Sequence, residues 1–180
     1  DDYARLKLQL ADLPIPVHLM IGNHDDRPTF VRTFPDLFND DGFVQYAVPL
    51  TIGTALCLDT WGPETHAGHY CAHRAAWLST QLEQADGPIW IFMHHNPVPI
   101  RIEPMDKIML LDADRFAETV APHRDKIRHI FHGHCHLPLT GSLHGIPVSA
   151  PRGTNHAGWP DFGATRLLSS AALPEAYSVI

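Results

Sequence analysis

Three histidine-rich clusters, each placed directly after a short apolar run, constrain the fold of this chain more than any other feature of its sequence. The apolar runs are Val17–Ile21, Pro88–Met93 and Ile127–Phe131, and the clusters that follow them are "GNHDD", "HHNP" and "HGHCH". Short apolar runs of this kind are typical of buried strands. In open α/β sheets, ligands bind outside the carboxyl ends of the strands. We therefore expect the three clusters to converge at one edge of a sheet and to form a site there.

The first two thirds of the chain alternate helices and strands, which predicts an α/β fold. Apolar periodicity and turn residues predict helices at Asp1–Leu13, Arg27–Phe38, Ala72–Ala85 and Asp112–Val120. Further strands are predicted at Phe43–Val48, Thr54–Leu58, Leu137–Leu143, Ile146–Ala150 and Ala176–Ile180. The 180 residues contain no repeat and no linker, so residues 1–180 are expected to form a single domain.

Composition excludes several classes of partner. The formal net charge is -7 and no cluster of Lys and Arg is present, which argues against a nucleic acid polymer. No apolar run reaches the ~18–20 residues that a membrane span needs, so no membrane partner is expected. Three cysteines without a close pair favour a reducing, cytoplasmic location. An anionic substrate would need a bound metal to offset its charge, and the fourteen histidines could supply ligands for one.

The "HGHCH" cluster has the spacing of a pair of metal ligands. In an extended segment alternate side chains share a face, so His134 and His136 are expected to point together and Cys135 to point away. Two convergent imidazoles suit Zn, Fe or Mn. The alternative is a pair of ordinary histidines hydrogen-bonded on a loop. The two other clusters favour the metal hypothesis.

The other two clusters add oxygen and nitrogen ligands. Because a strand alternates, only one of His94 and His95 is expected to face the site, and the alternative for His94 is a buried histidine bonded to the backbone. In "GNHD", Asn23 offers a hard oxygen ligand, His24 a proton for a leaving group, and Asp25 an acceptor that would orient the His24 ring. A plain turn is the alternative there. No C-x-x-C pair occurs, which argues against a structural zinc finger.

The ordered set of motifs resembles a known family. "GNHD", "MHHNP" and "GHCH", in this order and each after a strand, resemble the calcineurin-like metallophosphoesterases. Further segments resemble the branch that holds class III cyclic nucleotide phosphodiesterases and glycerophosphodiesterases, namely "RPTF", "CLDT", "WLSTQL", "FMHHNPVP" and "PRGTNH". The resemblance implies an α/β/β/α sandwich, hydrolysis of a small phosphodiester such as a cyclic nucleotide or a glycerophosphodiester, and assembly into homo-oligomers.

The resemblance also implies roles for particular residues. Two metal ions, of Mn, Fe or Zn, would occupy the site, with Asn23, His94 and His134 on one ion and His136 on the other. The substrate phosphate would contact Asn23, His24 and His136. His24 would be catalytic as the proton donor, with Asp25 beside it, and a metal-bound hydroxide would attack phosphorus.

One part of the family pattern is not found. The D-x-H and G-D motifs that precede "GNHD" in the family do not occur upstream of it here, so the sandwich is expected to be incomplete at its N-terminus, with apolar flanks exposed. Asp59 of "CLDT" matches a different family position from the bridging aspartate. Two further hypotheses follow: a non-catalytic remnant that binds one metal ion, or a partner chain that contributes the missing strands.

Overall fold

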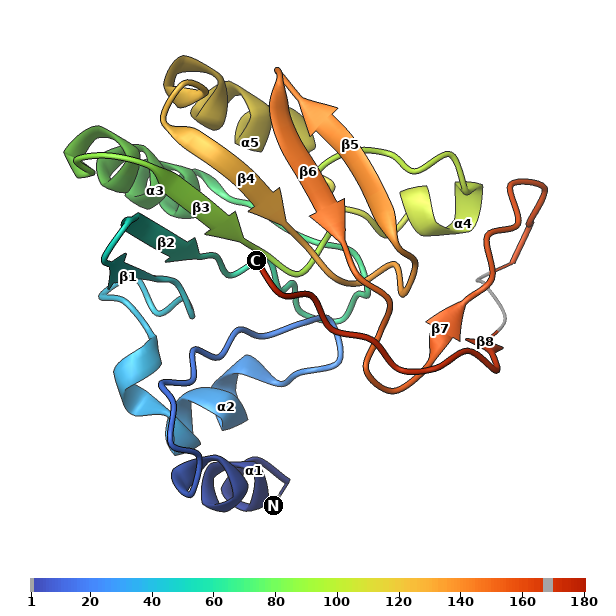
Figure 1. The fold of residues 1–180 in the computed structure, drawn as a ribbon, viewed down its shortest axis with the longest axis horizontal. Helices are drawn as coiled ribbons and strands as arrows, with labels where there is room; N and C mark the ends of the chain where they lie inside the picture. The colour runs from blue at the N-terminus through green and yellow to red at the C-terminus, as the bar shows by residue number, and fades with distance from the viewer. Residues whose placement is uncertain (1, 167–169) are drawn as a thin grey trace.

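The computed structural model describes residues 2–166 and 170–180, and it confirms the α/β class. A mixed sheet of six strands has the order β1-β2-β3-β4-β6-β5. Its strands are β1 (Tyr46–Leu50), β2 (Gly53–Cys57), β3 (Ile89–Phe92), β4 (Ile127–Phe131), β5 (Leu139–Leu143) and β6 (Ile146–Ala150). The inner strands β2, β3, β4 and β6 are parallel, and β1 and β5 pair antiparallel at the two edges. Figure 1 shows β3, β4 and β6 pointing toward the same edge of the sheet.

Three helices lie close to their predicted positions, the predicted helix Arg27–Phe38 is interrupted at Phe34, and the short helix Glu103–Asp106 was not predicted. The helices are α1 (Asp2–Ala11), α2 (Arg27–Thr33), α3 (Ala72–Gln84), α4 (Glu103–Asp106) and α5 (Ala113–Val120), with 3-10 turns η1 (Pro35–Leu37) and η2 (Ala121–His123). The N-cap of α2 is Asp26, whose side chain accepts a hydrogen bond from the Thr29 backbone N–H at 2.9 Å. No helix among the described residues is long and apolar enough to cross a membrane.

The core lies between the sheet and two helices. α3 buries Leu78 and Leu82, and α5 buries Phe116, against strand residues such as Ile91 and Ile130. Aromatic residues of β3 and β4, Phe92 among them, are only half-buried on the opposite face. That face carries an apolar cavity of about 460 Å³ over β1, β2 and β3. α3 and α5 thus cover one face of the sheet, and the opposite face carries the apolar cavity.

Two predicted strands are wrong. Val17–Ile21 has no strand conformation, because the strands nearest to the site already pair on both sides and offer it no edge. Its contact with the sheet is instead a hydrogen bond from the Tyr46 hydroxyl to the Leu19 carbonyl at 2.7 Å. Ala176–Ile180 also lies outside any strand, and Val179 is 90% exposed. A β-favouring composition forms a strand only where a partner strand has a free edge.

Smaller differences concern strand ends. β1 begins at Tyr46 rather than at Phe43, and Pro49 is accommodated because β1 is an edge strand. A two-stranded ribbon of β7 (Ala157–Gly158) and β8 (Ser170–Ala171) was not predicted. Asp1, the first residue of the predicted N-terminal helix, lies outside the described residues.

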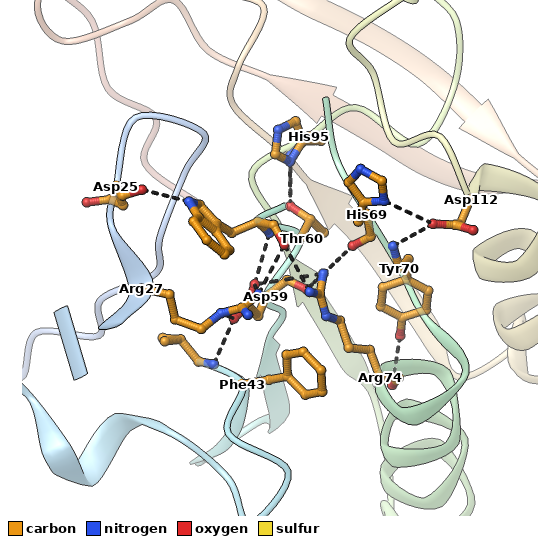
Figure 2. Close-up of polar contacts among 12 residues, drawn as sticks. Asp25, Arg27, Phe43, Asp59, Thr60, His69, Tyr70, Arg74, His95 and Asp112 are labelled. Carbon is orange, nitrogen blue, oxygen red and sulfur yellow. Dashed lines mark hydrogen bonds and ion pairs between the residues drawn. The ribbon is translucent and has the colours of Figure 1, made fainter. Parts of the chain in front are cut away.

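A buried carboxylate joins the sheet to the elements around it. Asp59, two residues after the end of β2, is 0% exposed. It accepts two hydrogen bonds from the Arg27 guanidinium, at 2.7 and 2.9 Å, and one each from the backbone N–H groups of Val44 and Trp61, both at 2.9 Å. Arg74 of α3 lies 3.9 Å from the same carboxylate and donates to the Asp59 carbonyl at 3.2 Å (Figure 2). This network ties α2, β2 and α3 together.

The same network positions the "GNHDD" turn. The Trp61 indole N–H donates to the Asp25 carbonyl at 2.6 Å (Figure 2). The Asp25 carboxylate accepts from the Tyr3 hydroxyl and from the Gly22 N–H, each at 2.7 Å. Since Arg27 follows this turn directly, its ion pair with Asp59 fixes the turn from the other end. The turn is therefore held to the sheet by side chains rather than by a strand.

Asp59→Asn is expected to lower the free energy of unfolding by about 3–5 kcal/mol, because it leaves the buried Arg74 and the half-buried Arg27 without their counter-charge. Urea denaturation followed by circular dichroism measures the change. The control is Glu103→Gln, which breaks the exposed pair of Glu103 with Lys107 and is expected to have no measurable effect. Equal stability of the two variants would contradict the importance given to Asp59.

Candidate metal centre

The turn before α2 and the loops after β3 and β4 meet at one edge of the sheet. The Asn23 Oδ1 lies 2.8 Å from the His94 Nε2. The rings of His94 and His134 have their centroids 5.2 Å apart. One ligand atom from each of His94, His95 and His134 lies within 4.8 Å of the others. The structure thus brings together side chains that are far apart in the sequence, as expected from their positions after strand candidates.

The backbone conformation of the "HGHCH" segment differs from the extended one that its spacing predicts. It is not extended, because His134 and His136 have φ values of 64° and 54°. Residues other than glycine adopt this left-handed conformation at a cost in energy, and such residues gather at functional sites. The two imidazoles nevertheless line one cavity of about 190 Å³. Cys135 points away, as predicted, and packs in an apolar cluster with Ile102 and Leu137.

His134 presents a buried ring nitrogen to the site. Its Nε2 is buried and has no hydrogen-bond partner. Burial lowers the pKa of His134 to about 4, while a hydrogen bond to the Ile108 backbone opposes this shift. The ring is therefore neutral at pH 7, and Nε2 is the ring nitrogen that the described residues leave without a partner. A ring held by the backbone through one nitrogen, with the other nitrogen free, is the arrangement found in metal-binding histidines.

The adjacent histidines of "HHNP" have different environments. Both ring nitrogens of His95 are occupied, since Nδ1 lies 2.8 Å from the Thr60 Oγ1 (Figure 2) and Nε2 lies 3.1 Å from the His66 carbonyl. The carbonyl can only accept, so His95 donates from Nε2 and accepts the Thr60 hydroxyl at Nδ1. Burial lowers the pKa of His95 to about 3. Although His95 is close enough to be a ligand, its bonds make it a support for His94.

The separation of the Asn23 Oδ1 and the His94 Nε2 would allow both atoms to bind one metal ion. Two ligand atoms about 2.1 Å from one ion and at right angles are roughly 3 Å apart, close to the Asn23–His94 separation. Burial and the neighbouring histidines hold the pKa of His94 well below its usual value, so the ring is neutral at pH 7. A Cβ on Gly22 would lie 2.7 Å from the His94 Cε1, so a glycine is required for this close approach.

The remaining predicted residues surround this cluster. His136 Nδ1 lies 2.7 Å from the His156 Nε2. His24 is exposed and its ring centroid lies 5.1 Å from that of His66. Both oxygens of the Asp25 carboxylate accept hydrogen bonds within the turn, from Tyr3 and Gly22, and neither contact involves His24. The catalytic role of Asp25 stays a prediction, and its contacts show that it holds the turn.

Sequence reasoning missed several participants. His66, which belongs to none of the three histidine clusters, lies with its Nδ1 3.0 Å from the Asn23 Nδ2. This bond orients the amide so that Oδ1 faces His94. Thr60 follows the buried Asp59 and bonds to His95. No spacing in the sequence signals these contacts, because each joins loops that only the folded chain brings together.

Comparison with known proteins identifies the family. The model of the calcineurin-like phosphoesterases matches residues 1–138. The chain belongs to the calcineurin-like phosphoesterase family. A "probable cyclic nucleotide phosphodiesterase" of Rhodopseudomonas palustris is 38% identical over 159 residues, which cover 86% of this chain and 58% of that protein. A "glycerophosphodiester phosphodiesterase" of Enterobacter lignolyticus is 31% identical over 141 residues, covering 76% of this chain and 50% of the relative.

A solved structure supports the same fold. A dimetal phosphatase from Danio rerio matches with a TM-score of 0.67 and 15% identity, over 82% of this chain and 64% of that one. This confirms the metallophosphoesterase-like fold. The chain spans about half the length of the curated relatives that it matches, from 50% to 58% for the two named above.

Thr60→Val is expected to lower the free energy of unfolding by about 1–3 kcal/mol, because it leaves the buried His95 Nδ1 without a donor. Chemical denaturation measures the change. Thr80→Val on the exposed face of α3 is the matched control, since the Thr80 hydroxyl bonds only to the Ala76 carbonyl of its own helix, at 3.0 Å. If both variants lower the free energy of unfolding by the same amount, the role of Thr60 in holding His95 is refuted.

Proposed function

We propose that this chain carries the metal site of a phosphodiester hydrolase that acts on small phosphodiesters. Asn23, His94 and His134 hold one metal ion, and His136 contributes to a second. The observation that carries the proposal is the convergence of the Asn23 Oδ1 and the His94 Nε2 with a buried His134 Nε2 that has no partner. A buried polar atom without a partner is costly unless a ligand satisfies it.

The ligand chemistry favours Mn, Fe or Zn. Imidazole nitrogens and an amide oxygen form a mixed set without thiolate, and such sets suit these ions. Cys135 is excluded as a ligand because it lies in an apolar cluster, where burial raises the pKa of its thiol to about 12. A thiol with that pKa stays protonated at neutral pH and cannot serve as a thiolate.

The residues around the metal site divide the remaining tasks. A bound divalent ion supplies a Lewis acid for the phosphate and lowers the pKa of water. Asn23, His24 and His136 contact the phosphate. Because His24 is exposed and at the mouth of the histidine cluster, it can donate a proton to the leaving oxygen. Asp25 keeps the turn in place through its two hydrogen bonds and so positions His24.

The substrate is a small phosphodiester such as a cyclic nucleotide or a glycerophosphodiester. Relatives of both names match most of this chain. The cavity beside His134 and His136 has a volume of about 190 Å³, which accommodates a phosphate group and little more. A net charge of -7 disfavours a polyanion, whereas one phosphate is neutralised by the metal.

The test is hydrolysis of bis(p-nitrophenyl) phosphate by the product of the whole gene, loaded with Mn²⁺. His134→Ala is expected to lower kcat/KM by at least about 100-fold and to lower the bound metal, because it removes a ligand. Cys135→Ala, in the same loop, is expected to retain both. Equal turnover by the parent and His134→Ala would refute the proposal. One metal ion or none per chain, without turnover, would favour the non-catalytic alternative.

A further inference from the structure

A second cavity adjoins the histidine-lined cavity and has apolar walls. Its volume is about 330 Å³, and its walls include Ile100, Ile102, Leu137, Leu139, Trp159 and Phe162. These residues come from the segment before α4, the segment leading into β5 and the loop after β7, which lie on one side of the molecule in Figure 1. Small-ligand pockets of roughly 300–1,000 Å³ are typical of proteins. The cavity is therefore large enough for one organic group of a ligand.

Arg152 lines both cavities and joins them. It is half-buried in the segment after β6, and no described residue gives it a hydrogen bond or an ion pair. No Asp or Glu is among the described residues that line either cavity. A guanidinium group suits the paired oxygens of a phosphate and stays charged at every working pH. The position of Arg152 therefore favours an anion at the junction of the two cavities.

Two aromatic side chains form the outer wall of the apolar cavity. Trp159 is 59% exposed and Phe162 is 70% exposed. Such large apolar surfaces lose contact with water when a ring or an aliphatic group covers them, and this burial favours binding. Offset or edge contacts between aromatic rings add to the attraction. Both residues can change without opening the core, because they are exposed.

We propose that Arg152 binds a non-bridging phosphate oxygen of the diester, and that the cavity walled by Trp159 and Phe162 takes an organic group that is esterified to this phosphate. This selects diesters that carry a planar aromatic or other apolar group over those whose organic groups are small and polar. The inference rests on the proposed function, since it assigns the substrate's parts to places around the same metal site.

The test is calorimetric binding of two phosphonates to the metal-loaded protein, which requires no turnover. Phenylphosphonate is expected to bind at least about 10-fold more tightly than methylphosphonate, a difference of about 1.4 kcal/mol. Trp159→Ala is expected to bring this ratio close to one without weakening methylphosphonate. Arg152→Gln is expected to weaken both ligands by a similar factor of about 10. Arg128→Gln, an exposed arginine on β4, is the control for the change in net charge.

The outcomes separate this inference from the proposed function. If the protein hydrolyses diesters but binds the two phosphonates equally, the apolar subsite is wrong and the hydrolase proposal stands. If Arg152→Gln binds both ligands as Arg128→Gln does, the role of Arg152 is wrong. If Trp159→Ala loses the preference for phenylphosphonate while hydrolysis of bis(p-nitrophenyl) phosphate still requires His134, both the apolar subsite and the hydrolase proposal are supported.

Discussion

The ion pair between Arg27 and the buried Asp59 is the interaction on which the site depends. Asp59 lies two residues beyond the end of β2, and Arg27 begins α2 immediately after the "GNHDD" turn, so their two hydrogen bonds join the sheet to the segment that carries Asn23 and His24. A buried carboxylate needs such partners, because an uncompensated charge in the interior costs several kcal/mol. The requirement is strong here because Val17–Ile21 forms no strand, and side-chain contacts replace backbone pairing as the anchor of the turn.

The residues next to Asp59 form hydrogen bonds that position the histidine-containing loops. Thr60 bonds to His95, and Trp61 bonds to the Asp25 carbonyl. Two further contacts act on the site directly. The Ile108 backbone bonds to the His134 ring, and His66 bonds to the Asn23 amide. Each contact fixes which atom faces the site, so that possible ligand atoms of Asn23, His94 and His134 are held there without a metal. Prior ordering of this kind removes part of the entropic cost of binding an ion.

Most of the fold and part of the site follow from sequence patterns. The helices and the buried strands β3, β4 and β6 were predictable because apolar periodicity reports burial, and burial decides these elements. Val17–Ile21 and Ala176–Ile180 were not, since pairing depends on a free sheet edge that sequence does not reveal. The convergence of His134 and His136 was expected from an extended segment, yet two left-handed residues produce it. His66 and Thr60 could not be found, because their contacts join distant loops.

The most direct measurement is anomalous diffraction from crystals of the Zn²⁺-loaded protein. The account predicts a peak about 2.0–2.2 Å from the Asn23 Oδ1, the His94 Nε2 and the His134 Nε2 together, with the His95 ring still bonded to Thr60. A peak held by His95 instead of His94, or a fully loaded crystal in which the His134 Nε2 touches no metal, would contradict it.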